Sequence, residues 1–156
     1  MSEKIKNIDQ NDRNILKALQ QDASLSLENL AARLSLSTNA CWRRIKRMEA
    51  DGIIERRVAI VQPESVGLGM TAFVAVKTND HSDKWLEKFA AAASSIEELV
   101  EFYRMAGEVD YMLKFLVRDM ADYDRVYKKL IKAVSLSDVS ASFAMERIKY
   151  TTAVPV

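Results

Sequence analysis

The stretch that decides the fold covers residues 37–48, STNACWRRIKRM. Its apolar residues Cys41, Ile45 and Met48 recur at positions i, i+4 and i+7, which is the spacing of one face of an α-helix. A narrow apolar stripe of this kind packs on a neighbouring helix and leaves the opposite face to solvent or to a partner. The stretch is therefore predicted to be a short helix that begins after Ser37, whose hydroxyl can accept a hydrogen bond from the first turn.

The opposite face of this helix is basic. Asn39, Arg43 and Lys46 recur there at the same spacing, and Arg47 flanks them. Guanidinium, ammonium and amide groups bind phosphates and the base edges of guanine and adenine. The face therefore has the composition of a DNA recognition helix, although a solvated basic helix that binds nothing has the same composition.

A second short helix is predicted just before this one. Ser26 can cap it, Leu30, Ala31 and Leu34 form its apolar face, and residues 35–37 separate it from the basic helix. Two short helices around a three-residue turn are the geometry of a helix-turn-helix unit, whose second helix enters the DNA major groove. This neighbour favours the DNA-binding interpretation over the solvated one.

Two flanking segments complete the predicted unit. Asp9 precedes a helix over residues 10–21, and residues 55–61 read as an extended wing or connector strand beside the DNA backbone. The residues predicted to contact DNA are Ser37, Thr38, Asn39, Arg43, Arg44, Lys46, Arg47, Arg56 and Arg57.

The net charge of the chain is only +1, but it is unevenly divided. Through Gln62 there are eleven Lys and Arg against eight Asp and Glu, a surplus of +3, and from Pro63 onward twelve against fourteen, a deficit of −2. The basic surplus therefore belongs to the part predicted to bind DNA. Because the surplus is modest, we expect moderate affinity per subunit, compensated by assembly of several subunits.

Composition also excludes several classes of protein. No run approaches the roughly 20 apolar residues that cross a bilayer, and the first residues lack the apolar core of a secretory signal, so a cytoplasmic protein without a membrane partner is expected. The single cysteine, Cys41, excludes an internal disulfide and a cysteine-based zinc cluster, and it is expected to be buried. No metal or cofactor is predicted.

The second part of the chain begins after residues 63–69, PESVGLG, which hold one of the two prolines and two of the four glycines. The predicted domains are residues 1–62, a helix-turn-helix DNA-binding domain with a connector strand, and residues 63–156. Extended apolar runs predict strands over 70–78, 99–105, 111–117 and 139–150. Apolar residues at helical spacing predict helices over 83–93 and 123–134. The order β-α-β-β-α-β is that of a ferredoxin-like sandwich with both helices on one face, so the fold class is α+β.

Both faces of this sheet contain apolar residues. Phe73 and Ala75 alternate with Ala72 and Val74, yet helices cover one face only. The other face is expected to meet a second subunit. A two-fold dimer would bury it and would supply two helix-turn-helix units for double-stranded DNA at a pseudo-palindromic site.

Three stretches of the chain, residues 8–16, 43–49 and 107–111, resemble the Lrp/AsnC (feast/famine) family of transcription regulators, and the resemblance extends over essentially the full length. Within that family, residues 105–108 and 142–152 are most similar to the cysteine-responsive regulators. The chain departs from the family at Ser35, where glycine is common, and at residues 37–41, where a proline is frequent. The second departure bears on base preference, because Asn39 can bind adenine.

The resemblance implies a small amino acid as effector, bound between dimers of an octameric ring, with cysteine favoured and the branched-chain amino acids or methionine next. The residues it assigns to the effector are Met105, Ala106, Gly107, Glu108, Asp110, Tyr111, Met120, Ser140 and Ser142. Asp110 can accept from the ammonium group, while a glycine turn and serines can donate to the carboxylate. A purely structural turn, with Asp110 tightening the hairpin, is the alternative.

Two other functions share parts of this pattern. Siroheme decarboxylases have the same two-domain build, but their chemistry requires histidines around a large cavity, and this chain has only His81. An architectural protein that wraps DNA with little sequence choice is the second alternative. A sequence-specific regulator, not an enzyme, is the prediction that the residues favour.

Overall fold

The computed structural model describes residues 7–156, which fold into two compact units. One unit combines residues up to Ile60 with Lys149–Val156, and the other is Val61–Ile148. The chain therefore passes from one unit to the other twice. No helix in the described part of the chain is long and apolar enough to cross a membrane.

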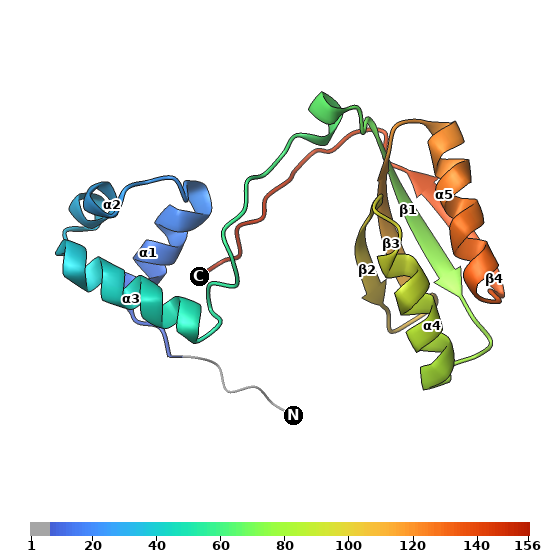
Figure 1. The fold of residues 1–156 in the computed structure, drawn as a ribbon, viewed down its shortest axis with the longest axis horizontal. Helices are drawn as coiled ribbons and strands as arrows, with labels where there is room; N and C mark the ends of the chain where they lie inside the picture. Colours follow the sequence, from blue (N-terminus) through green and yellow to red (C-terminus); the bar gives the residue numbers. More distant parts are fainter. Residues whose placement is uncertain (1–6) are drawn as a thin grey trace. The chain divides into compact units, whose positions relative to one another are not determined.

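The first unit contains three helices, α1 (Gln10–Gln21), α2 (Leu27–Leu34) and α3 (Thr38–Ala50) (Figure 1). The predicted caps are confirmed: Ser26 and Ser37 each accept from a backbone N–H three residues on. Asp9 does so as well, and the Asp12 carboxylate accepts from the Asp9 N–H in return, which closes a capping box. Side-chain caps satisfy backbone donors that the first turn of a helix leaves unpaired.

The three helices enclose one small core. Ile15 of α1, Leu30 of α2 and the predicted stripe Cys41, Ile45 and Met48 of α3 are all buried in it. Burial raises the pKa of the Cys41 thiol, so this cysteine serves as a core residue. The predicted amphipathic helix and the burial of its stripe are confirmed.

The turn between α2 and α3 is the one place within residues 7–156 where a residue other than glycine has a positive φ. Ser35 adopts φ +54° there, in the part of the chain that the structure describes, and the Leu36 N–H donates to the Ala31 carbonyl at 3.0 Å. The left-handed conformation ends α2 and turns the chain into Ser37. Serine thus takes the place of the usual glycine without loss of the helix-turn-helix geometry.

The second unit contains a four-stranded antiparallel sheet and two helices, preceded by a short 3₁₀ helix, η1 (Pro63–Val66). The elements are β1 (Met70–Lys77), α4 (Asp83–Ser94), β2 (Leu99–Arg104), β3 (Tyr111–Val117), α5 (Met120–Ala133) and β4 (Asp138–Phe143). The strand order is β2-β3-β1-β4, and α4 and α5 lie on the same side of the sheet (Figure 1). The predicted ferredoxin-like order and the α+β class are confirmed.

The core of this unit lies between the sheet and the helices. Ala72, Val74 and Val76 of β1 are buried against Phe89 of α4 and Leu130 of α5, among others. Residues between them on β1 point to the other face of the sheet, since side chains alternate along a strand. The helices thus bury one face and leave the second open within the chain.

The open face is more polar than the sequence suggests. Phe73 is 40% exposed on it, opposite Lys114 on β3 and Ser142 on β4. Lys114 Nζ lies 2.6 Å from the Glu101 carboxylate, which also accepts from the Tyr103 hydroxyl. The face therefore combines an apolar centre with one charged pair.

The last strand is shorter than predicted. β4 pairs only with β1, and the Ala144 N–H, which donates to the Thr71 carbonyl, is the final rung of that ladder. The prediction of a strand over residues 139–150 is wrong beyond Phe143, because β1 begins at Met70 and offers no partner farther on. Residues 55–61, predicted as a wing or connector strand, are likewise in no helix or strand.

Candidate DNA-binding and effector sites

The outward face of α3 presents the first candidate site. Asn39, Arg43 and Lys46 are exposed along it, and Thr38 is half-buried in the first turn. In the described part of the chain the Arg43 side chain has no ion-pair partner. Trp42, next to Arg43, is 52% exposed, so packing does not cover it. This face offers an amide, a guanidinium and an ammonium group to a partner.

Two of the predicted DNA contacts turn inward instead. Arg44 Nη1 lies 2.6 Å from Asp9 Oδ2 and 2.9 Å from Asp12 Oδ1, and Arg47 donates to the other oxygen of Asp12. Arg44 is only 27% exposed, whereas Arg47 is 47% exposed. Arg44 therefore ties α3 to the start of α1, and Arg47 does so while keeping part of its guanidinium accessible.

The carboxylate that receives both arginines is fully buried. Burial alone would raise the pKa of Asp12, but hydrogen bonds from the Asp9 N–H and from the Arg44 and Arg47 guanidinium groups outweigh it, so the pKa lies below its usual value. The charged form is thus the stable one in the folded chain. Asp12 fixes the position of α3 relative to α1.

A second tie joins α3 to the segment that follows it. Lys46 Nζ lies 2.8 Å from Glu49 Oε2, and Arg57 Nη2 lies 3.2 Å from Glu49 Oε1. The hydrogen bond from Lys46, helped by the charges of Lys46 and Arg57, lowers the pKa of the Glu49 carboxyl. Arg56 is exposed and lies 3.7 Å from the exposed Glu55. Exposed pairs of this kind exchange readily for a phosphate.

The second candidate site is the hairpin between β2 and β3. The Met105 N–H donates to the Asp110 carbonyl at 2.8 Å, and the Asp110 N–H donates to the Val76 carbonyl at 3.0 Å. Gly107 has φ +134°, a conformation that side chains rarely adopt. Glu108 Oε1 lies 3.6 Å from Lys77 Nζ. The hairpin thus holds Met105, Ala106, Gly107 and Glu108 at the end of the sheet, all exposed.

Asp110 makes a structural hydrogen bond in addition to its predicted role as ammonium acceptor. Its Oδ2 accepts from the Thr78 N–H at 2.8 Å, and its Oδ1 lies 3.9 Å from His81 Nδ1. This bond ties the loop after β1 to the hairpin. The two predicted roles of Asp110, turn former and ammonium acceptor, are compatible because each oxygen retains a lone pair. His81, to which the sequence assigned no role, lies beside this carboxylate.

The remaining predicted effector residues do not share one surface. Tyr111 is buried between Trp85, Phe89 and Phe102 on the helix side of the sheet. Ser140 and Ser142 pair with Ala75 and Phe73 and lie on the open side. Tyr111 therefore anchors the start of β3 in the core on the helix side of the sheet. Ser140 and Ser142 could contact an effector only from the open face, which is expected to meet another subunit.

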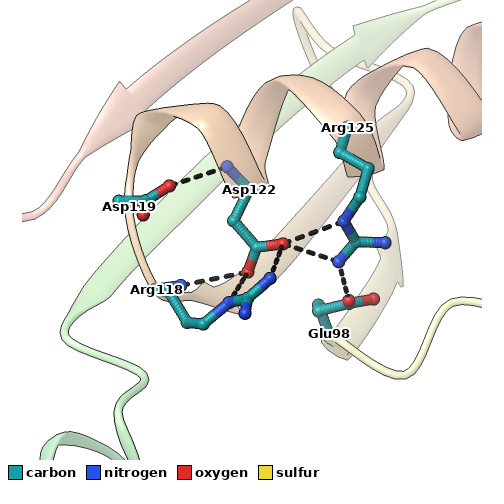
Figure 2. A network of polar contacts seen from close by, with 5 residues as sticks. All are labelled: Glu98, Arg118, Asp119, Asp122 and Arg125. Carbon is teal, nitrogen blue, oxygen red and sulfur yellow. Dashed lines mark hydrogen bonds and ion pairs between the residues drawn. The ribbon is translucent and has the colours of Figure 1, made fainter.

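Met120, the last predicted effector residue, is the exposed first residue of α5. Figure 2 shows the polar network that holds this end of the helix: the Asp119 carboxylate accepts from the Asp122 N–H, and Asp122 accepts from Arg118 and Arg125. Hydrogen bonds from Arg118 and then Arg125 hold the pKa of the buried Asp122 far below its usual range. The network fixes the first turn of α5.

The same network reaches a second element. Arg125 also donates to Glu98, which directly precedes β2 (Figure 2). The pattern S/T/D-x-x-D/E at the helix start was the available sequence signal for the Asp119 cap. The contact with Glu98, 27 residues away, has no such signal. Among residues 7–156, no group of three His, Cys, Asp or Glu side chains is placed to hold a metal ion.

Models of two known domain families match the two units of the chain. Residues 8–55 match the winged helix-turn-helix DNA-binding model, and residues 71–154 match the Lrp/AsnC ligand-binding domain model. The first match contains α1, α2 and α3, and the second contains the whole sheet except Met70. The domain that carries the hairpin is thus related to domains that bind ligands.

Individual relatives extend over nearly the full length. The DNA-binding transcriptional activator DecR of Escherichia coli K12 is 49% identical over 96% of this chain and 99% of its own length. The crystal structure of an AsnC family transcriptional regulator from Agrobacterium tumefaciens is 49% identical, with a TM-score of 0.92 over 95% of this chain and 97% of that chain. A Neisseria meningitidis transcriptional regulator, solved as a complex with L-Met, is 33% identical, with a TM-score of 0.90 over 96% and 97%.

These matches bear on the enzymatic class left open by the sequence. The matched relatives are transcription regulators, so an enzymatic role is not supported. A winged helix-turn-helix DNA-binding region and an Lrp/AsnC ligand-binding domain occur together in this chain. The chain belongs to the Lrp/AsnC family of DNA-binding transcription regulators.

Proposed function

We propose that this chain is a sequence-specific regulator whose DNA affinity or assembly state responds to a small amino acid. The observation that carries the proposal is the exposed face of Asn39, Arg43 and Lys46 on α3, in a chain that also carries a ligand-binding domain. The amino-acid class of the ligand is supported by the related Neisseria regulator, whose structure holds L-Met.

On DNA, the residues of the first unit divide into three roles. Asn39 and Arg43 contact base edges, because an amide matches adenine and a guanidinium matches guanine in the major groove. Phosphate contacts come from the caps and the remaining cations: Ser37, Thr38, Lys46, Arg47, Arg56 and Arg57. Arg44 positions α3 through Asp9 and Asp12, so it supports DNA binding without reaching the bases.

The effector is bound at the hairpin. Asp110 accepts from the ammonium group, and the backbone N–H groups around Gly107 donate to the carboxylate. Because Ser140 and Ser142 lie on the open face, a complete site needs a neighbouring subunit. We infer a homodimer through that face and an octamer of four dimers, with two helix-turn-helix units per dimer on a pseudo-palindromic site.

Cysteine is the favoured effector, and the branched-chain amino acids and methionine come next. Cysteine is favoured because residues 105–108 and 142–152 resemble the cysteine-responsive members of the family. A rival route to a cysteine effect is oxidation of Cys41. That thiol is buried and its raised pKa disfavours the reactive thiolate, so direct binding is the better explanation.

Thermal unfolding in the presence of each of the twenty amino acids tests this proposal. A ligand at one hundred times its dissociation constant stabilises the folded chain by about 2.7 kcal/mol. We expect the largest shift with cysteine in the presence of reductant, and the same shift in Cys41→Ser. No shift with any amino acid would contradict the proposed effector class.

Architectural wrapping of DNA predicts a different result in a salt titration. A protein that binds only phosphates loses affinity steeply with salt and does not prefer an operator over random DNA. We expect instead a preference of at least about a thousandfold, which is the lower range for specific binding. Equal affinity for both DNAs would establish the architectural role.

A further inference from the structure

The C-terminal tail, residues 149–156, is the part of the chain whose location no local pattern explains. The chain leaves the second unit after Ile148, and the tail belongs to the first unit, the one with the helix-turn-helix. Residues 144–156 form no helix or strand. Some other interaction must therefore keep the tail on the first unit.

One such interaction comes from a side chain of α1. Gln20, in the last turn of α1, donates through Nε2 to the Val154 carbonyl at 3.1 Å, and its Oε1 accepts from the Val154 N–H at 2.7 Å. A single amide thus pairs with both polar groups of one tail residue, as a neighbouring strand would. Two residues farther on, Val156 packs against the helical core of the unit. The tail is clamped at Val154 and anchored by its last side chain.

The tail lines a groove at the surface of the first unit. Thr152, Val154 and Val156 form one wall of a groove of about 730 Å³, and the end of α1 and the connector form the others. Ile53 and Ile54, which precede the connector, also line this groove. Thr152 and Val154 are exposed and Val156 is only partly buried against the core, so the tail can detach without unpacking a fully buried residue.

The clamp lies on the helix that also positions the recognition helix. α1 carries Gln20 at one end and Asp12 at the other, and Asp12 holds Arg44 and Arg47 of α3. At its other end the tail follows β4, which carries Ser140 and Ser142. The tail is therefore a covalent route from the strand of the effector site to the scaffold of the DNA-binding face.

We propose that residues 149–156 are a strap that transmits the effector response to the DNA-binding unit. When the strap is docked, the connector and the strap together limit the motion of the DNA-binding unit. This restricted unit binds the operator more tightly. A change at β4 on effector binding undocks Val154 from Gln20 and removes one restriction. This inference rests on the proposed amino-acid response, since that response is what the strap carries.

Two variants release the strap while leaving the helices intact. Gln20→Ala removes both hydrogen bonds and places the best helix former near the end of α1. A chain ending at Thr152 lacks both Val154 and Val156. Gln10→Ala is the matched control, because Gln10 lies on the same helix and its amide makes an exposed hydrogen bond to Asn14 of that helix.

The experiment measures operator affinity with and without cysteine, and cysteine affinity by calorimetry, in the full chain and these variants. In Gln20→Ala and in the shortened chain we expect operator binding to weaken about twofold to tenfold, the effect of ordering a few extra groups. By linkage, cysteine should bind these variants as tightly as or more tightly than it binds the parent chain, because binding no longer has to undock the strap. The ratio of the two operator affinities should be near one. Gln10→Ala should behave as the parent chain does.

A ratio that stays at the parent value in both strap variants would overturn the proposal, because the response would then travel by the connector alone. If the parent chain shows no response to any amino acid, the proposed effector is refuted separately. In that case, the operator affinity measured without amino acid tests whether the docked strap favours DNA binding. Unchanged affinity in both variants refutes it, and weakened affinity in both supports it.

Discussion

The basic residues of α3 do three different jobs, although they are neighbours in the sequence. Arg43 faces solvent, Arg44 is held by Asp9 and Asp12, and Lys46 pairs with Glu49 in the next turn of the same helix. Side chains one position apart on a helix point about 100° away from each other, so adjacent arginines can have unrelated partners. Neighbouring arginines of α3 can therefore have different roles, one available to bind DNA and the next holding the helix in place.

That division predicts different effects for two arginine substitutions. Arg43→Ala should weaken specific binding by roughly 1 to 3 kcal/mol and leave the free energy of unfolding unchanged, because the proposed role of Arg43 is to contact a base. Arg44→Ala should lower the free energy of unfolding, because it leaves the buried Asp12 with one partner fewer. Operator binding and urea unfolding of both variants measure this. Equal loss on operator and random DNA for Arg43→Ala would make it a phosphate contact.

Asp12 gives the first unit a stability that depends on pH. Its pKa in the folded chain lies below the ordinary value of 3.8, so its contribution is present above that value and is lost as pH falls through the lowered folded-state pKa. Asp12→Asn should therefore cost about 1 to 3 kcal/mol at pH 7. The difference between parent and variant should narrow below about pH 4 in urea titrations. A difference that is constant from pH 7 to pH 2 would contradict this role.

The sequence predicts which face of α3 is buried but not which arginine is tied down. The stripe of Cys41, Ile45 and Met48 follows from helical spacing alone. The partner of Arg44, by contrast, is a carboxylate 32 residues earlier, and no local pattern links the two. Contacts of this kind depend on how the helices pack, which spacing along one helix does not specify.

At the scale of elements, starts are easier to predict than ends. Helix starts have side-chain caps, and the predicted Asp9, Ser26 and Ser37 all act as caps. The end of β4 depends instead on how far β1 extends beside it, so alternation in the sequence runs past Phe143 where the ladder stops. Element identity could be predicted here, while the ends of edge strands could not.

The open face of the sheet leads to a prediction about assembly. Phe73 lies at its centre, between Lys114 and Ser142, and a second subunit is expected to cover it. Phe73→Asp should shift the chain toward monomer, because each dimer would have to bury two added carboxylates in place of two aromatic rings. Light scattering at micromolar concentration measures the mass. Phe143→Ala is a poorer probe, because that ring packs on Tyr123 on the helix side.

The matched control for this experiment is Ile131→Asp on α5, because Ile131 is 40% exposed, as Phe73 is. α5 lies on the helix side of the sheet, so this change does not alter the open face (Figure 1). It should leave the mass unchanged. A monomeric parent chain, or an unchanged mass for Phe73→Asp, would place the subunit interface elsewhere.

At the scale of the whole molecule, the proposed effector and DNA-binding sites belong to different units joined by two chain crossings. Coupling between two such sites is a free energy that each ligand exerts on the other, so a change confined to one site should leave the affinity of the other unchanged when the first ligand is absent. The family resemblance predicts the location of the effector site, and the hairpin geometry shows how Asp110 also serves the fold. A variant that separates these two tasks is therefore needed.

Asp110→Asn is that variant. The amide oxygen of asparagine can still accept from the Thr78 N–H, which now bonds Asp110 Oδ2 at 2.8 Å, so the loop and the hairpin stay joined. The negative charge that pairs with the effector's ammonium group is lost. We expect operator affinity without amino acid to match the parent chain and the cysteine response to disappear, with cysteine affinity reduced at least about tenfold, the effect of one charge-assisted hydrogen bond. Glu87→Gln is the control, since Glu87 is an exposed carboxylate on α4 of the same unit and is not among the predicted effector residues. Loss of the response in both variants would indicate a general effect of charge, and a retained response in Asp110→Asn would exclude Asp110 as the ammonium acceptor.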